Sequence, residues 1–311
     1  MTTETAVRPR PATESETPPP HRRGAGLPAL GFLAPFLVLY LAFIIGPALY
    51  GLVMSFFDTS LVKPGLSGFA GFGNYAEALR SGDFWSSLWH TLWFTILTTP
   101  PLILLAFAFA LLADRARRGR WFFRLAFFAP FILPSAVVAL IWIFLYTPGL
   151  GLLEAGLGKI GITSPNWLGD PSWAMPSLAI TTIWWTLGFN FVLYLAGLQE
   201  IPRDLYEAAA MDGASPWQQI RKITIPMLGR TTTLVAVLQV IASLKVFDQM
   251  YIMTQGGPNF GTRSILEYVY DEGFTNFRVG YAAAVSMLFF VVVLAVSAVW
   301  FALVRRQEKE V

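Results

Sequence analysis

Six apolar segments, each long enough to cross a lipid bilayer as a helix, constrain this chain more than any other feature. A helix needs about 20 residues to cross the hydrocarbon of a bilayer. Inside lipid the backbone must satisfy its own hydrogen bonds, so runs of this length form helices. The pattern predicts an all-α, polytopic membrane protein with six transmembrane helices. The segments run approximately over 30–57, 88–112, 122–146, 174–198, 231–254 and 280–304.

The composition fits a bilayer as the solvent. Of the 311 residues, 55% are hydrophobic and 13% are charged, whereas an ordinary globular domain carries about 25% charged residues. The chain has no cysteine, which excludes disulfides, thiol nucleophiles and thiolate metal sites. Its two histidines, His21 and His90, have no partner at metal-ligand spacing. We therefore expect no metal site and no histidine-based catalytic site.

The two ends of the chain and its basic residues predict a topology. Residues 1–26, which include a Pro-, Thr-, Glu- and Arg-rich stretch, predict a disordered tail, and residues 27–311 predict the transmembrane domain. The first apolar segment is longer than the roughly 7–15 residues of a secretory signal. With the N-terminus inside, 16 of the 22 Lys and Arg residues lie on the inner side and five on the outer side. This asymmetry predicts that both termini are cytoplasmic.

Prolines in or near the first three segments predict kinks, because proline removes a helical hydrogen bond. These residues are Pro35, Pro47, Pro100, Pro101, Pro130 and Pro134.

The longest predicted inner loop, 199–229, has the pattern of two short helices joined by a turn. Pro202 begins the first helix, and Gly213 ends it because glycine adopts the left-handed conformation at low cost. Ser215 is suited to cap the next helix, with Pro216 at its first position. The residues by themselves leave two interpretations open. The loop is either a knob for docking another protein, small at its centre and charged at its rim, or an amphipathic helix lying on lipid.

The amino-acid sequence of this loop resembles the cytoplasmic EAA signature of ATP-binding-cassette importer permeases. Further stretches resemble the carbohydrate-uptake branch of that family, typified by the maltose permease. The chain departs from many relatives at Met227, where they carry a second proline. The matching signature comprises Glu207-Ala208-Ala209, Gly213 and Ile223-Thr224-Ile225-Pro226, and the further stretches are 195–199, 211–215, Phe247-Asp248, 254–258 and 280–284.

The resemblance implies a function and a set of partners. The loop is expected to insert as a coupling helix into a cleft of a separate ATPase subunit. The chain itself is then no enzyme and binds no cofactor, because ATP and Mg lie on that partner, in agreement with the absence of a phosphate-binding Gly-x-x-x-x-Gly-Lys-[Ser/Thr] loop. The coupling contacts are expected at Glu207, Ala208, Ala209, Asp212, Gly213, Ala214 and Arg203.

The expected assembly contains a second homologous permease subunit, two nucleotide-binding ATPase subunits and an extracytoplasmic sugar-binding protein, in the plasma (inner) membrane and without nucleic acid. The expected substrate is a di- or oligosaccharide. Import of glycerol 3-phosphate or a polyol is an alternative. A less favoured alternative is an ion-coupled secondary transporter, which usually carries more intramembrane carboxylates.

Lys245 and Asp248 are the only charged residues well inside a predicted span. A charge at mid-membrane costs at least about 2.5–3.5 kcal/mol, so it usually faces a partner or a cavity. The two lie three residues apart, on one helical face. They form either a mutual salt bridge or part of a substrate path with aromatic and amide side chains, which suit sugar rings and hydroxyl groups. The candidate residues for that path are Asn190, Trp185, Tyr194, Ser243, Lys245, Asp248 and Gln249.

Overall fold

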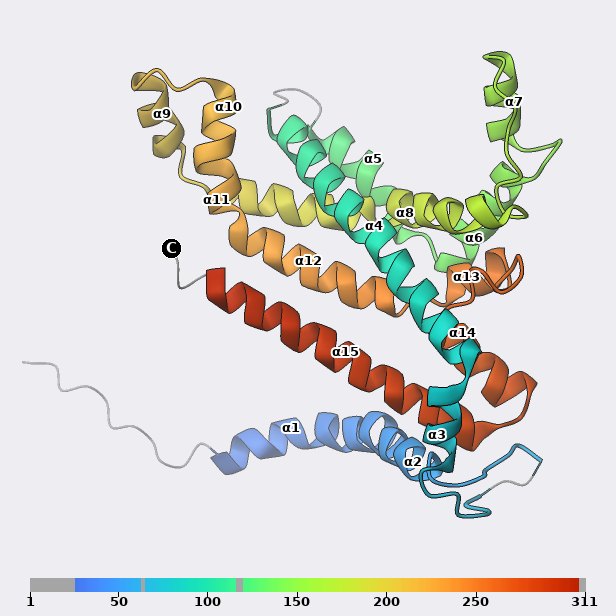
Figure 1. Ribbon diagram of the computed structural model, residues 1–311. Coiled ribbons are helices and arrows are strands. Elements are labelled where there is room, and N and C mark those ends of the chain that lie inside the picture. The colour runs from blue at the N-terminus through green and yellow to red at the C-terminus, as the bar shows by residue number, and fades with distance from the viewer. Residues whose placement is uncertain (1–25, 63–64, 116–119, 308–311) are drawn as a thin grey trace, which may run out of the picture. The chain divides into compact units, whose positions relative to one another are not determined.

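The structure, a computed structural model, describes residues 26–62, 65–115 and 120–307 and confirms the all-α prediction. Most of the predicted tail, 1–25, lies outside the described residues. Within them, the only β contact is an isolated bridge between Phe57 and Phe69. The helical elements (Figure 1), of which η1 to η3 are π-helical turns, are α1 Gly26–Tyr40, η1 Leu41–Ile45, α2 Gly46–Met54, α3 Gly73–Arg80, α4 Gly82–Arg115, α5 Arg120–Ile132, α6 Ser135–Tyr146, α7 Leu152–Lys159, α8 Pro171–Glu200, α9 Arg203–Met211, α10 Pro216–Gln219, η2 Ile220–Thr224, α11 Ile225–Met227, α12 Gly229–Leu244, α13 Asp248–Met253, α14 Ile265–Tyr270, η3 Asp271–Thr275 and α15 Val279–Gln307.

The chain divides into two compact units, 1–50 and 51–311. In the first unit, α1 passes into η1, where the Gly46 N–H donates to the Leu41 carbonyl. Pro47 follows at once and has no N–H to offer the carbonyl four residues before it, so the helix widens by one residue there instead of breaking. The same device recurs at η2, where the Ile225 N–H donates to the Ile220 carbonyl directly before Pro226.

Four helical stretches are long and apolar enough to span a membrane, at 32–54, 82–115, 171–200 and 279–299. Two bent helix pairs raise the number to six if each pair is one span. The pair at 121–132 and 135–146 bends by 98° at Leu133–Pro134, and the pair at 216–227 and 229–244 bends by 63°. The third predicted span is therefore broken rather than kinked, whereas Pro100 and Pro101 leave α4 in one piece.

The predicted fifth span, 231–254, was wrong as a single helix. α12 ends at Leu244 and α13 begins at Asp248. Lys245 follows the last residue of α12 and Asp248 opens α13, and helix dipoles favour a cation and an anion at these two positions. No ion pair joins Lys245 to Asp248 in the described chain. The predicted shared helical face does not exist, because the break at 245–247 separates the two residues.

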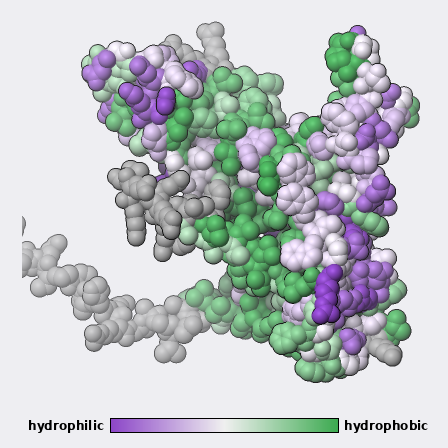
Figure 2. Space-filling view, viewed as in Figure 1, coloured by the Kyte–Doolittle hydropathy of each residue, from purple (hydrophilic) through white to green (hydrophobic). Residues whose placement is uncertain are grey.

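In the second unit, α4 packs against α8, α12 and α14, and α5 packs against α8. Gly188 of α8 allows this last approach, since a Cβ atom there would collide with the Phe127 carbonyl of α5. Large apolar side chains such as Leu104 and Phe290 face outward, as lipid-facing residues do. Figure 2 shows hydrophobic side chains over the middle of this unit and hydrophilic ones over the α9–α10 end and the opposite end.

Candidate functional site

The segment between α8 and α12 forms a small helical knob, which comprises α9, α10, η2 and α11 (Figure 1). Gly213 ends α9 with φ +77°, as predicted from its identity. Ser215 caps α10 through a capping box: its Oγ accepts from the Gln218 N–H at 3.3 Å, and the Gln218 Oε1 accepts from the Ser215 N–H at 2.7 Å. A bond of 2.9 Å between the Tyr206 and Thr224 hydroxyls holds α9 to η2.

The surface of the knob is unusually open for a folded segment. No residue of α9 is buried. Met211 is 84% exposed and Trp217 is 67% exposed, although such side chains usually avoid water. Glu207 and Arg203, both exposed, lie on the same short helix. An apolar patch with charged neighbours is the arrangement that a protein partner would cover.

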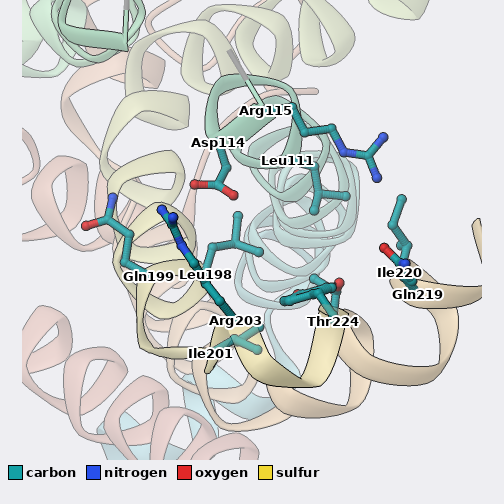
Figure 3. Close-up of a pocket in the computed structure, with 11 residues that line it drawn as sticks. Leu111, Asp114, Arg115, Leu198, Gln199, Ile201, Arg203, Gln219, Ile220 and Thr224 are labelled. Carbon is teal, nitrogen blue, oxygen red and sulfur yellow. The ribbon is translucent and has the colours of Figure 1, made fainter. Parts of the chain in front are cut away.

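A hollow of about 600 Å³ lies beneath the knob (Figure 3). It separates the end of α4, with Asp114 and Arg115, from α9 and η2. Of the expected coupling residues, only Arg203 lines this hollow. The knob is attached to the membrane helices through Ile201 and Leu228, which flank it and are buried in one core cluster, and through Tyr206 and Ile223, which pack against that cluster.

A second cavity, of about 300 Å³, lies where the break between α5 and α6 meets the break between α12 and α13. The break between α5 and α6 contributes Phe131 and Ser135, and the break between α12 and α13 contributes the stretch 245–249. Irregular backbone at membrane depth is tolerated where it lines a cavity. The cavity is therefore lined by the irregular backbone of broken helices, a construction that is common at the solute sites of transporters.

Hydrogen bonds tie the walls of this cavity together. The Ser135 hydroxyl donates to Asp248 Oδ2 at 2.6 Å. The Trp185 indole N–H donates to the Leu133 carbonyl at 3.1 Å, which satisfies an acceptor freed at the first break. The Thr182 hydroxyl donates to Gln249 Oε1 at 2.6 Å. The polar lining is thus held in a fixed arrangement by α6, α8 and α13.

Five of the seven predicted substrate-path residues line this cavity, namely Trp185, Ser243, Lys245, Asp248 and Gln249. Asn190 is buried and does not line the cavity. Its side-chain N–H donates at 3.0 Å to the side-chain oxygen of Gln239, which does line the cavity. Tyr194 is buried in a hydrophobic cluster and packs edge-on against Phe107. The structure therefore brings together the five and leaves Tyr194 among core residues.

Sequence reasoning missed the contributions of α5, α6 and the middle of α8 to the cavity. Pro134 was a usable signal for Ser135, because a break opens the backbone beside it. The threonines of α8 carry no such signal, since a threonine hydroxyl can equally donate to the preceding turn of its own helix, as that of Thr186 does to the Thr182 carbonyl. The missed residues are Phe94, Phe131, Ser135, Thr182, Thr186, Ala242, Val246 and Phe247.

No group of three or more His, Asp or Glu side chains is placed to hold a metal ion in the part of the chain that the structure describes. The site is built instead from single donors and acceptors, with Lys245 and Asp248 as its only charges. Such a lining is suited to hydrogen-bond a polar solute and not to activate one chemically.

Comparisons with known proteins give a consistent result. The family described as binding-protein-dependent transport system inner membrane component matches residues 66–309. The chain is 32% identical to the sulfoquinovosyl glycerol transport system permease protein SmoG of Agrobacterium fabrum, over 92% of each chain. It is 34% identical to the trehalose/maltose transport system permease protein MalF of Thermococcus litoralis, over 87% of this chain and 92% of the relative.

Among solved structures, the fold is similar to a chain from the crystal structure of a bacterial ABC transporter involved in the import of the acidic polysaccharide alginate. The TM-score is 0.78 at 26% identity, and the match covers 90% of this chain and 96% of the other.

Proposed function

Because this chain belongs to the family of inner-membrane components of binding-protein-dependent transport systems, we propose that it is the permease subunit of a saccharide importer, with the α12–α13 break as its solute site. The chain is a permease of an ATP-binding-cassette transporter and not an enzyme, and the ATPase is a separate chain. ATP and Mg are bound by that ATPase.

The knob couples the permease to the ATPase. Its open surface, with exposed Met211 and Trp217, supports this role, as does the packing of its Tyr206 and Ile223 against a core cluster of the membrane helices, which can transmit a movement of the knob. Seven residues form the contact, with small side chains that allow a close approach and charged ones at the rim. They are Glu207, Ala208, Ala209, Asp212, Gly213, Ala214 and Arg203.

The solute is a di- or oligosaccharide. Asp248 offers hydrogen-bond acceptors, Lys245 offers donors, and the Trp185 ring offers an apolar face, which together match hydroxyl groups and the C–H face of a sugar ring. The two charges do not pair with each other, so the ammonium group of Lys245 and the Asp248 oxygen that does not accept from Ser135 are available to a solute. The names of two relatives point the same way, since both include a sugar or a sugar conjugate.

The complete importer contains a second permease, two ATPase subunits and an extracytoplasmic binding protein. The chain contributes one half of the path, and its termini and knob lie in the cytoplasm. The distribution of Lys and Arg supports this orientation. A binding protein is supported by the family to which the chain belongs.

The test is to purify the tagged chain from its native membrane in mild detergent and to identify its partners by mass spectrometry. We expect a second permease and an ATPase in stoichiometric amounts. The cognate binding protein is then screened by calorimetry against disaccharides, trisaccharides, polyols and glycerol 3-phosphate. A homo-oligomer without an ATPase contradicts the assembly, and a binding protein that takes only glycerol 3-phosphate contradicts the saccharide assignment.

A further inference from the structure

Four aromatic rings beside the cavity form a continuous cluster across α13, α14 and η3. Phe247, Tyr251 and Tyr270 contact one another, with ring centroids 5.3, 5.6 and 5.1 Å apart. Phe274 stacks on Tyr270 at 5.4 Å. These spacings are within the range of direct aromatic contact. Tyr270 is therefore the ring that connects the inner part of the cluster to Phe274.

The cluster reaches from the cavity to the surface. Phe247 lines the cavity beside Lys245 and Asp248. Phe274, at the other end, is 62% exposed. The cluster thus offers a path of ring surface between solvent and the cavity.

None of the four rings belongs to the three hydrophobic clusters that form the core of the described chain. Their neighbours Met250 and Tyr268, by contrast, are fully part of it. The packing of the fold therefore does not account for the four rings. Partly open aromatic rings that lead to a cavity are able to contact a solute.

Acidic residues alternate with the rings along the chain. Asp248 follows Phe247 directly, and Asp271 follows Tyr270 directly. Asp248, which is exposed, and Asp271, which is half-buried, place hydrogen-bond acceptors on the same segments as the rings. Lipid tails would not favour carboxylates at these positions, whereas a pyranose ring presents an apolar C–H face and hydroxyl groups at once.

We propose that Phe247, Tyr251, Tyr270 and Phe274 form a saccharide-stacking track along which linked pyranose rings pass between the surface and the cavity. The inference rests on the proposed function and deepens it, because it assigns to these four residues a route for the proposed saccharide outside the cavity. Phe247 is stacked on Tyr251, and Tyr270 on Phe274, so each ring has one face turned away from its stacked neighbour. The solute rings contact these outer faces and the ring edges, and the carboxylates accept hydrogen bonds from the sugar hydroxyls. Phe274 is the first ring to be contacted from the surface.

The test uses the complete importer with its partner permease, ATPase and binding protein in proteoliposomes. An equimolar mixture of maltose, trehalose, sucrose, maltotriose and raffinose is supplied, and mass spectrometry identifies what accumulates inside. The transported sugar then serves as the probe for direct binding to the permease–ATPase complex in nanodiscs, measured by saturation-transfer NMR. Three variants are compared with the wild type: Phe274→Leu, Phe274→Trp and, as a matched control on the exposed face of α15, Phe290→Leu.

We expect Phe274→Leu to raise the dissociation constant about 5- to 10-fold, with a larger effect on a trisaccharide than on a disaccharide. Phe274→Trp keeps a stacking face and should stay within about twofold of the wild type, as should Phe290→Leu. Unchanged binding by Phe274→Leu overturns the track, while transport by the wild type still upholds the importer. Loss of the second permease or of the binding protein from the Phe274→Leu complex also overturns it, because the ring is then a subunit contact. Uptake of none of the five sugars by the wild type rejects the saccharide importer and the track with it.

Discussion

The Ser135 hydroxyl donates a hydrogen bond of 2.6 Å to Asp248 Oδ2, between residues that lie 113 positions apart. Each is the first residue of a helix that follows a break, Ser135 of α6 and Asp248 of α13. The bond therefore joins the break between α5 and α6 to the break between α12 and α13 at the wall of the cavity. It also leaves the other carboxylate oxygen of Asp248 free for a solute hydroxyl.

Replacing Asp248 should impair transport without impairing assembly. Asp248→Asn keeps the size of the side chain and the bond from Ser135, but removes the charge that would strengthen hydrogen bonds from a sugar. We expect uptake to fall about 10-fold or more, in line with the loss of roughly 1.5–3 kcal/mol for a charged hydrogen bond. Initial uptake rates in proteoliposomes measure the effect, and co-purification of the ATPase measures assembly.

The same experiment tests whether Lys245 and Asp248 act as a pair. No ion pair joins them in the described structure, so the effects of Lys245→Gln and Asp248→Asn should be additive. The double variant should therefore transport less than either single variant. A double variant that recovers the activity of the better single one would show that the salt bridge forms in the working importer.

A charge at the turn of the knob should uncouple transport from ATP hydrolysis. Gly213 adopts φ +77°, so Gly213→Asp strains the turn and places a carboxylate on the face proposed to enter the ATPase. We expect uptake below about one tenth of the wild type, while the amount of inserted protein stays the same. The added Cβ meets nothing within 4 Å in this chain, so the fold itself has room for it.

The matched control for this change is Gly161→Asp. Gly161 adopts φ +75°, also with nothing within 4 Å of an added Cβ, but it lies in the loop between α7 and α8. The two variants carry the same backbone strain and the same charge. Equal loss of uptake in both would mean that strain, not the position on the knob, is responsible.

The stability of the protein should depend on pH through Glu267. This residue is 2% exposed. Burial, aided by the negative charge of Asp271, raises the pKa of Glu267 from 4.5 to about 7. A carboxyl whose pKa is raised by folding contributes stability that is complete below the pKa of the unfolded chain and is lost as the pH rises through the folded pKa. The loss therefore falls between about pH 4.5 and pH 7.

Thermal unfolding in detergent from pH 5 to pH 8 measures this loss. Glu267→Gln stays neutral, so its midpoint should fall less across the range and exceed that of the wild type at pH 8. The pKa shift of Glu267 corresponds to a change of roughly 3 kcal/mol at most in the free energy of unfolding. Glu200→Gln, at an exposed carboxylate of the opposite end, is the control and should follow the wild type. If the midpoints of Glu267→Gln and the wild type change in parallel with pH, Glu267 is not the source of the pH dependence.

A methyl group at Gly188 should weaken the packing of α5 on α8. An added Cβ collides with the backbone carbonyl of Phe127, which cannot rotate away as a side chain would. Overpacking of this kind costs about 1–3 kcal/mol, so we expect a lower midpoint of thermal unfolding for Gly188→Ala. Gly156→Ala in α7 adds the same methyl group in open space and should leave the midpoint unchanged or raise it.

The sequence by itself determined the parts of this protein that follow local rules. The apolar segments had to become membrane helices, because a backbone in lipid satisfies its hydrogen bonds within its own segment. The knob followed from Gly213, Ser215 and Pro216, whose conformations and caps depend on neighbours three or four residues away. The family resemblance includes the signature of this knob, which is why the function was predictable.

Only the tertiary structure decided where the third and fifth segments break and what meets at those breaks. Hydropathy measures how apolar a segment is and not whether its helix continues. The segment 231–254 was therefore predicted as one span. Ser135 with Asp248, and Asn190 with Gln239, are contacts between residues 113 and 49 positions apart. Such pairs depend on how whole helices cross, which is set by close approaches such as that of Gly188 to Phe127. No spacing within one segment carries that information.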